Sequence, residues 1–196
     1  MAGPFLKNNY KIQYINNMAC GQLKEFTFDS CSGNIGGIKR VWLAEYDPTY
    51  VISSTTVDDI EQIVKVTNSG GTDIEWVEFQ LKKNSANAES AYQVGDGGSV
   101  FCQTTLAMTF NKQDAGKRMA IQSLALNELY AIYEDANGNR WFLGKDNPVT
   151  LSEGGGSTGQ QKTDLNSYNV SLVDDSMELP LAVQQNYPVS GGNVPA

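Results

Sequence analysis

Residues 99–110 read SVFCQTTLAMTF, and this stretch decides the fold class of the chain. Apolar and polar side chains alternate along it, and one face collects Val100, Cys102, Leu106, Met108 and Phe110. Alternation with a period of two residues predicts a β-strand that is buried on one side. The stretch is about twice as long as a typical strand of about five or six residues. Such length suits a barrel, or a sheet that continues across subunits.

Further strands are predicted on both sides of this stretch. Residues 38–46 follow a Gly-Gly pair and stop at an Asp-Pro pair, which are typical boundaries of a strand. Residues 62–67 and 74–83 flank the turn sequence Asn-Ser-Gly-Gly and predict a β-hairpin. Residues 128–134 and 140–144 flank an Asn-Gly pair, which supplies the positive φ angles of a tight hairpin turn.

One helix is predicted, at residues 113–127, with Asn111 as its N-cap. Its apolar residues recur at helical spacing and indicate packing against a core, at Met119, Ala120, Ile121, Leu124 and Ala125. After it, residues 168–172 alternate again as a strand. Many strands with a single helix predict a mainly β chain, a β-sandwich or barrel with one packed helix and extended loops or arms.

The domain organisation follows from these elements. Residues 31–183 form the predicted β-sandwich domain, which contains the helix and a long loop at 153–163. Residues 1–30 are expected to be an N-terminal arm, and residues 184–196, with two prolines and a Gly-Gly pair, a C-terminal arm. The glycine run within the loop does not match the spacing of a phosphate-binding loop, so a flexible hairpin loop is the better interpretation.

The charge balance argues against a nucleic-acid reader. The net charge is −8, and no basic stripe of the kind that nucleic-acid readers carry is visible. Charged residues make up 18% of the chain, below the usual value of ~25%. Uncharged polar residues take their place, as is common where a protein buries much of its surface against its own copies. An acidic surface would let DNA pass by repulsion between like charges.

The residue inventory gives no support for an enzyme or a cofactor site. Histidine is absent, which removes the commonest general base and metal ligand. The three cysteines match no zinc-binding spacing. Two acidic clusters, Asp58-Asp59 with Glu61 and Asp174-Asp175 with Glu178, lack the spacing of a calcium loop. They are interpreted as solvated turns, and calcium binding at a sheet end stays open.

The three tryptophans allow two interpretations. Trp42, Trp76 and Trp141 all fall in predicted strands. Exposed, they could build a sugar-binding platform or a protein interface, whereas buried they are core residues, and the second interpretation is favoured. No run approaches the ~18–20 apolar residues of a membrane helix, so no membrane partner is expected.

Several landmarks resemble a known family, the virion proteins of phages and prophages of Bacteroidetes hosts that are described as tail or structural proteins. The landmarks span about residues 31–175 in order: Cys31 followed by GGIKRVWLA at 36–44, FNKQD at 110–114 with Arg118, DANGNRWFLG at 135–144, and Thr158-Gly159 followed by DLNSYNVSL at 164–172. Ser167 departs from the family, where glycine is expected, and so does the long stretch past Pro180.

The resemblance implies a tail-tube-like fold and a structural protein of the tail, without catalytic residues or cofactors. Subunits would join sheet edges into a ring, by analogy hexameric, and rings would stack into a conduit through which DNA passes unbound. The chain would be made in the host cytoplasm and would reside in the virion beside other tail or neck proteins. The expected assembly residues are Gly154, Gly155, Gly156, Thr158 and Gly159, with Phe5 and Tyr187 from the two termini.

Two other functions stay open on the sequence. A head–tail connector, tail-terminator or tail-hub ring of the virion would form one ring of fixed copy number in place of a tube. A carbohydrate-binding β-sandwich module of an adhesin would bind glycans as a monomer through an exposed tryptophan.

Overall fold

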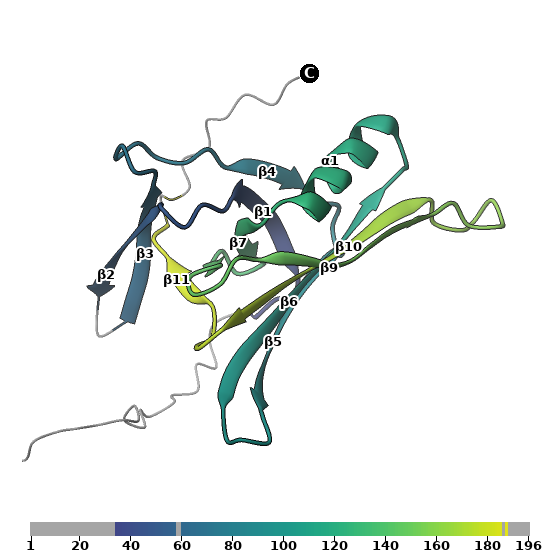
Figure 1. Cartoon of the computed structure of the whole chain (residues 1–196). Helices are drawn as coiled ribbons and strands as arrows, with labels where there is room; N and C mark the ends of the chain where they lie inside the picture. Colours follow the sequence, from purple (N-terminus) through teal and green to yellow (C-terminus); the bar gives the residue numbers. More distant parts are fainter. Residues whose placement is uncertain (1–33, 58–59, 186, 188–196) are drawn as a thin grey trace, which may run out of the picture. The chain divides into compact units, whose positions relative to one another are not determined.

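The computed structural model describes residues 34–57, 60–185 and 187, and within them the chain forms two sheets and one helix (Figure 1). The seven-stranded sheet has the order β2 (Val51–Val57), β3 (Ile60–Thr67), β11 (Leu181–Val183), β8 (Arg140–Leu143), β7 (Leu129–Asp135), β1 (Ile38–Glu45) and β4 (Val77–Gln80). The four-stranded sheet has the order β5 (Ala86–Val94), β6 (Val100–Asn111), β10 (Ser167–Ser176) and β9 (Thr150–Ser157). The helix is α1 (Ala115–Leu126).

The prediction of a mainly β chain with one helix is confirmed. Each sheet ends in two different edge strands, β2 and β4 in one and β5 and β9 in the other, so neither sheet closes into a barrel. Of the two predicted architectures, a β-sandwich or a barrel, the barrel is therefore wrong, and the chain forms two open sheets.

The first core lies between the two sheets, as the alternation at 99–110 predicts. Leu106 and Met108 of β6 pack there with Leu172 of β10, against Val41 and Leu43 from β1. Cys102, on the same face of β6, is buried as the sequence indicates. Burial of these side chains holds the four-stranded sheet on the seven-stranded one.

A second core lies on the other face of the seven-stranded sheet. Trp42 of β1, Ile132 of β7, Phe142 of β8 and Ile63 of β3 belong to one buried cluster, although β1 and β3 are separated by three other strands. The Ile74 N–H donates to the Val66 carbonyl in β3, and Val77, three residues later, pairs with Leu43 in β1, so the sheet curves to bring these strands close together. The central strands β1 and β7 are thus buried on both faces.

The strongest turn signals are confirmed. Strand β1 falls within the predicted 38–46, and β7 and β8 form the predicted hairpin, with Gly138 at φ +94° in its turn. The hairpin predicted from 62–67 and 74–83 is confirmed only at its turn, where Thr67 bridges to Asp73, and its strands then separate. Strand β3 pairs with β2 and β11, whereas β4 pairs with β1, because Trp76 between them turns into the second core.

The helix lies where it was predicted but is less buried than its apolar residues suggest. It begins at Ala115, and its N-cap is Asp114, whose carboxylate accepts a hydrogen bond from the Lys117 backbone N–H. The prediction of Asn111 as the N-cap is therefore wrong. Among the helical residues only Leu124 is fully buried, while Met119 is 68% exposed.

The loop predicted at 153–163 is in part a strand. Residues up to Ser157 belong to β9 and pair with β10, from Ser157 opposite Ser167 to Glu153 opposite Ser171. Glycine favours loops in general, but here β10 offers a long, regular partner edge that outweighs the local preference. The connection between β9 and β10 is correspondingly shorter, from residue 158 to 166.

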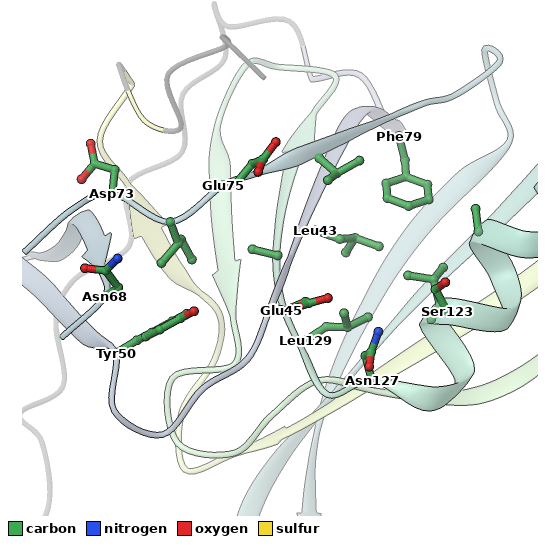
Figure 2. A pocket seen from close by; sticks show the side chains of 15 residues that line it. Leu43, Glu45, Tyr50, Asn68, Asp73, Glu75, Phe79, Ser123, Asn127 and Leu129 are labelled. Atoms are coloured by element: carbon green, nitrogen blue, oxygen red, sulfur yellow. The ribbon is translucent and has the colours of Figure 1, made fainter. Parts of the chain in front are cut away.

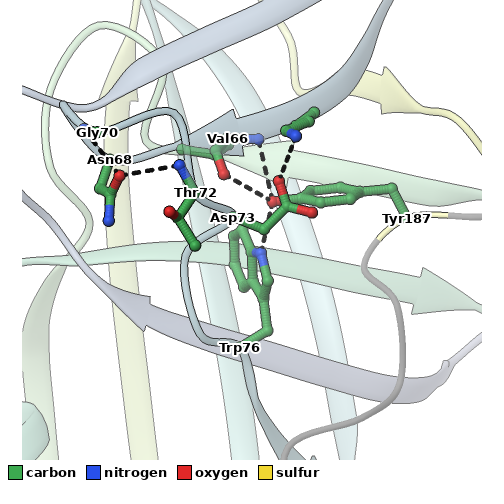
Figure 3. A network of polar contacts seen from close by, with 8 residues as sticks. Val66, Asn68, Gly70, Thr72, Asp73, Trp76 and Tyr187 are labelled. Atoms are coloured by element: carbon green, nitrogen blue, oxygen red, sulfur yellow. Dashed lines mark hydrogen bonds and ion pairs between the residues drawn. The ribbon is translucent and has the colours of Figure 1, made fainter.

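The expected C-terminal arm begins later than residue 184. Tyr187 is buried in the second core, where its hydroxyl contacts Trp76 and Val66 (Figure 3). Residues 186 and 188–196 lie outside the described residues, as does the N-terminal arm of residues 1–30.

Candidate functional site: the open edges of the four-stranded sheet

The first open edge belongs to β5. All nine residues of β5 pair with β6 in one regular register, from Ala86 opposite Met108 to Val94 opposite Val100. The Thr109 N–H donates to the Ser85 carbonyl, so the backbone groups of odd-numbered residues in β5 face β6. Those of the even-numbered residues, such as Ala88 and Ser90, face the open edge.

The second open edge belongs to β9. The Lys112 N–H donates to the Asn166 carbonyl, which puts the even-numbered backbone groups of β10 on the β6 side and the odd-numbered ones on the β9 side. In β9 the groups of Gly155 therefore face β10, and those of Gly154 and Gly156 face the open edge. All three glycines are exposed, although α1 lies near this strand.

The β5 edge carries none of the usual protections against pairing, and the β9 edge carries one only near its start. Natural edge strands are blunted by lysine, proline, shortness or a bulge. In the other sheet, β4 has only four residues and β2 is bulged between Ser53 and Ser54. Strand β5 has no bulge, proline or lysine, and β9 is regular beyond a bulge at Ser152. Among the described edge strands, β5 is therefore open along its whole length, and β9 is open and regular from Glu153 to Ser157.

The outer face of the four-stranded sheet is polar and has no basic residue. The sequences of β5, β6, β9 and β10 contain neither lysine nor arginine. The face turned away from the core carries small or uncharged side chains with a few carboxylates, namely Asn87, Glu89, Ala91, Gln93, Phe101, Gln103, Thr105, Ala107, Thr109, Asn169, Ser171, Val173 and Asp175. Such a face offers no cation to a nucleic-acid phosphate.

The predicted assembly residues are brought together only in part. Gly154, Gly155 and Gly156 lie on the β9 edge, and Thr158 and Gly159 follow directly in the β9–β10 connection. Gly159 has φ +72°, and the Asp164 carboxylate accepts hydrogen bonds from the N–H groups of Gln160 and Gln161. These two bonds hold the pKa of Asp164 below its ordinary value.

The two terminal residues do not join this site. The Tyr187 side chain is buried within the subunit and does not lie on the β9 edge, and its role in assembly stays a prediction. Phe5 lies outside the described residues. The β5 edge was missed in the sequence, because its alanines and serines alternate too weakly in polarity to signal a strand.

A pocket of about 520 Å³ lies elsewhere, between α1 and the edge of β1 and β4 (Figure 2). Leu43, Phe79 and Leu129 give it apolar walls, and Glu45 and Glu75 lie at its rim. These carboxylates would suit a ligand that is positively charged, or one that combines a positive charge with an apolar part.

Glu61 and Glu178 of the two acidic clusters make contacts within the protein, whereas Asp58 and Asp59 lie outside the described residues. Glu61 and Glu178 both bind the Lys145 ammonium, at 3.2 and 2.7 Å. Burial lowers the pKa of Lys145, but the two carboxylates outweigh it and the net shift is upward. Within the described part of the chain, no group of three or more carboxylate, cysteine or histidine side chains is arranged to hold a metal ion.

The tryptophans are packed inside the subunit, as the favoured interpretation has it. Trp42 is 2% and Trp76 9% exposed, and Trp141 packs partly buried against the first core. Over the ranges that the structure describes, no helix combines the length and apolar character needed to cross a membrane. No protein-family model and no curated protein matches the chain.

Proposed function

We propose that this chain is a structural subunit of a tailed-phage virion, of the tail-tube type, which works by joining its own copies. In this proposal β9 of one copy pairs with β5 of the next, and the joined sheets close into a ring that stacks with others. The support for the virion assignment is the resemblance of the landmarks at 31–175 to those of phage structural proteins. The subunit carries out no chemistry and needs no cofactor.

The observation that carries the proposal is the pair of open edges on one four-stranded sheet, β5 over its whole length and β9 beyond its bulge. Neighbouring strands in this sheet are all antiparallel, so β5 and β9 run in opposite directions. When β9 meets β5 of a copy rotated about an axis roughly along the strands, the new pair is also antiparallel. Head-to-tail joining therefore continues the same hydrogen-bond pattern from copy to copy, and closes when the rotation completes a circle.

The uncovered face of this sheet supports the role of a conduit. In a ring of joined sheets, one face of every sheet turns toward the axis and the other carries the core. The uncovered face presents amide, hydroxyl and carboxylate groups without a basic residue. DNA passing such a wall would meet repulsion in place of phosphate contacts, and would slide without being held.

A connector, terminator or hub ring of the same virion would use the same two sheet edges. It would differ from a tail tube only because its rings do not stack. Negative-stain electron microscopy and sedimentation of the purified chain separate these outcomes. Tubes with a central channel support the tail-tube role, and single rings of fixed size support the connector class. A monomer at all concentrations would overturn the proposal.

A further inference from the structure

We propose that copies of this chain stack head to tail through the two opposite ends of the four-stranded sheet, an inference that rests on the proposed function and names its stacking contact. One end is acidic and includes the turn between β5 and β6. The other end is basic and includes the residues before β5 and after β6. The turn of one copy enters the basic end of the next.

The register of the strands defines these two ends. At one of them Val94 lies opposite Val100, and Ser176 lies opposite Cys102. At the other Ala86 lies opposite Met108, and Ser167 lies opposite Asn111. Strand β6 connects the two ends over its twelve residues, which corresponds to roughly 40 Å at ~3.4 Å per residue.

The acidic end, which we define by its carboxylates, gathers charge from three segments. They are the β5–β6 turn, the end of β10 and the segment that precedes β9, with the exposed residues Asp96, Asp146, Asp175 and Glu178. The last two segments are tied together, since the Asp146 carboxylate accepts from the Met177 N–H and Asn147 donates to the Asp175 carbonyl. The one lysine in these segments, Lys145, is already bound to Glu61 and Glu178.

The basic end, which we define by its cations, gathers Lys82, Lys83, Lys112, Lys117, Arg118 and Lys162 from the segments around the other ends of the same strands. Its two carboxylates are engaged locally. Asp114 pairs with Lys117 at 2.9 Å, and Asp164 accepts from backbone N–H groups. The remaining cations, Lys82 and Lys83 among them, have no ion-pair partner within the described residues.

The tip of the β5–β6 hairpin carries an apolar face that nothing in the described part of the subunit covers. Tyr92, Val94 and Val100 continue the core-facing row of the sheet but are 52%, 73% and 52% exposed. Figure 1 shows this hairpin extending past the neighbouring strands. Asp96 lies in its turn, which is closed by the hydrogen bond from the Gly95 N–H to the Ser99 carbonyl. The tip is therefore an apolar projection with a negative charge at its end.

A complementary hollow of about 790 Å³ lies at the basic end. Lys82, Lys83 and Asn84 line it together with Leu165, an exposed apolar residue. It thus offers cations for Asp96 and apolar surface for Val94 and Val100. Tip-to-tip or hollow-to-hollow contacts would bring like charges together, so the charges favour head-to-tail stacking, which grows into a filament.

The test exchanges charges between the two ends. In the Asp96→Lys variant, the hairpin tip carries a lysine and faces the lysines of the hollow. In the Lys82→Glu/Lys83→Glu variant, the tip keeps Asp96 and faces two glutamates in the hollow. We expect the critical concentration for stacking of each variant to rise by about tenfold or more, with lateral rings retained. An equal mixture should stack again, because both of its alternating contacts then join opposite charges.

The control is Glu78→Lys, which makes the same charge change as Asp96→Lys on exposed β4, and should stack like the wild type. Stacks are measured by sedimentation and electron microscopy at low and high salt, and each variant's fold is checked by circular dichroism. This inference would be overturned if the variant rings stack as well as the wild type, or if the mixture of the two variants does not stack. Either result would leave the proposal of joined sheet edges intact. If the wild-type protein forms no rings at all, the proposed function is overturned, and this inference with it.

Discussion

The hydroxyl of Tyr187 accepts a hydrogen bond from the indole nitrogen of Trp76, with 2.6 Å between the two heavy atoms (Figure 3). The same hydroxyl accepts from the Val66 N–H at 3.0 Å and lies 3.5 Å from the Val66 carbonyl. Two stretches more than a hundred residues apart, residues 66–76 and Tyr187, therefore meet at one buried oxygen. This contact fastens the residues after β11 to the curved seven-stranded sheet.

Replacing Tyr187 by phenylalanine should destabilise the subunit measurably. The change removes one oxygen and leaves two buried donors, on Trp76 and Val66, without a partner. We expect the free energy of unfolding to fall by about 1–3 kcal/mol, as measured by urea denaturation. Tyr92→Phe is the control, because Tyr92 is exposed and should lose little. Equal stability of the two variants would show that the buried network contributes nothing.

Asp174 should make stability depend on pH in an unusual direction. Its carboxyl is 3% exposed, its Oδ1 has no hydrogen-bond partner, and its Oδ2 accepts from the Ser176 hydroxyl. Burial raises the pKa of Asp174 above the ordinary 3.8, against the hydrogen bonds from Ser176 and the Gly144 backbone. The folded state therefore holds this proton to higher pH than the unfolded chain, and Asp174 costs stability as the pH rises.

Asp174→Asn should accordingly stabilise the protein at pH 7, and the gain should shrink as the pH falls through the folded-state pKa toward 3.8. Urea unfolding between pH 4 and 8 measures the difference. Asp175→Asn is the neighbouring control on the exposed face, and should show little of this pH dependence. A gain that stays constant over the whole range would contradict the assignment.

Two glycines near the assembly edge should respond differently to alanine. At Gly159 the backbone has φ +72°, and a Cβ would collide with Asp164. At Gly155 a Cβ meets nothing within 4 Å. Gly159→Ala should lower the free energy of unfolding by about 1–2 kcal/mol, while Gly155→Ala should be nearly neutral. Comparable thermal unfolding of both variants would contradict this structure of the β9–β10 connection.

Strand signals in the sequence were reliable where local chemistry and tertiary packing agree. Strand β6 shows a clear alternation because one face meets the core and the other does not. The β7–β8 hairpin was predictable because Gly138 must take a positive φ. Strand β5 gave no such signal, since it is formed by pairing with β6 along side chains as small as Ala86 and Ala88.

The parts that escaped the sequence depend on contacts over long separations. The glycines of β9 predict a loop, and only the neighbouring edge of β10 makes them a strand. Tyr187 looked like part of a free arm, yet its partners Trp76 and Val66 lie more than a hundred residues earlier. The glycines of the candidate site were thus named from the sequence as assembly residues in a loop, whereas their place on an edge strand and the β5 edge were not predicted.

Gly154→Pro should block lateral assembly without unfolding the subunit. The Gly154 backbone faces the open edge, so a proline there removes a donor that only a neighbour would use. We expect monomers in sedimentation velocity, with circular dichroism unchanged. Gly155→Ala keeps every backbone donor, so it should assemble like the wild type and serves as the control. Rings formed by the proline variant would exclude β9 as the joining edge.

The most direct measurement is a cryo-electron microscopy reconstruction of the assembled protein in which strands can be traced. Our account predicts one continuous antiparallel sheet around a channel, with β9 of each copy hydrogen-bonded to β5 of the next. Copies that meet through other surfaces, with β5 and β9 both facing solvent, would contradict it.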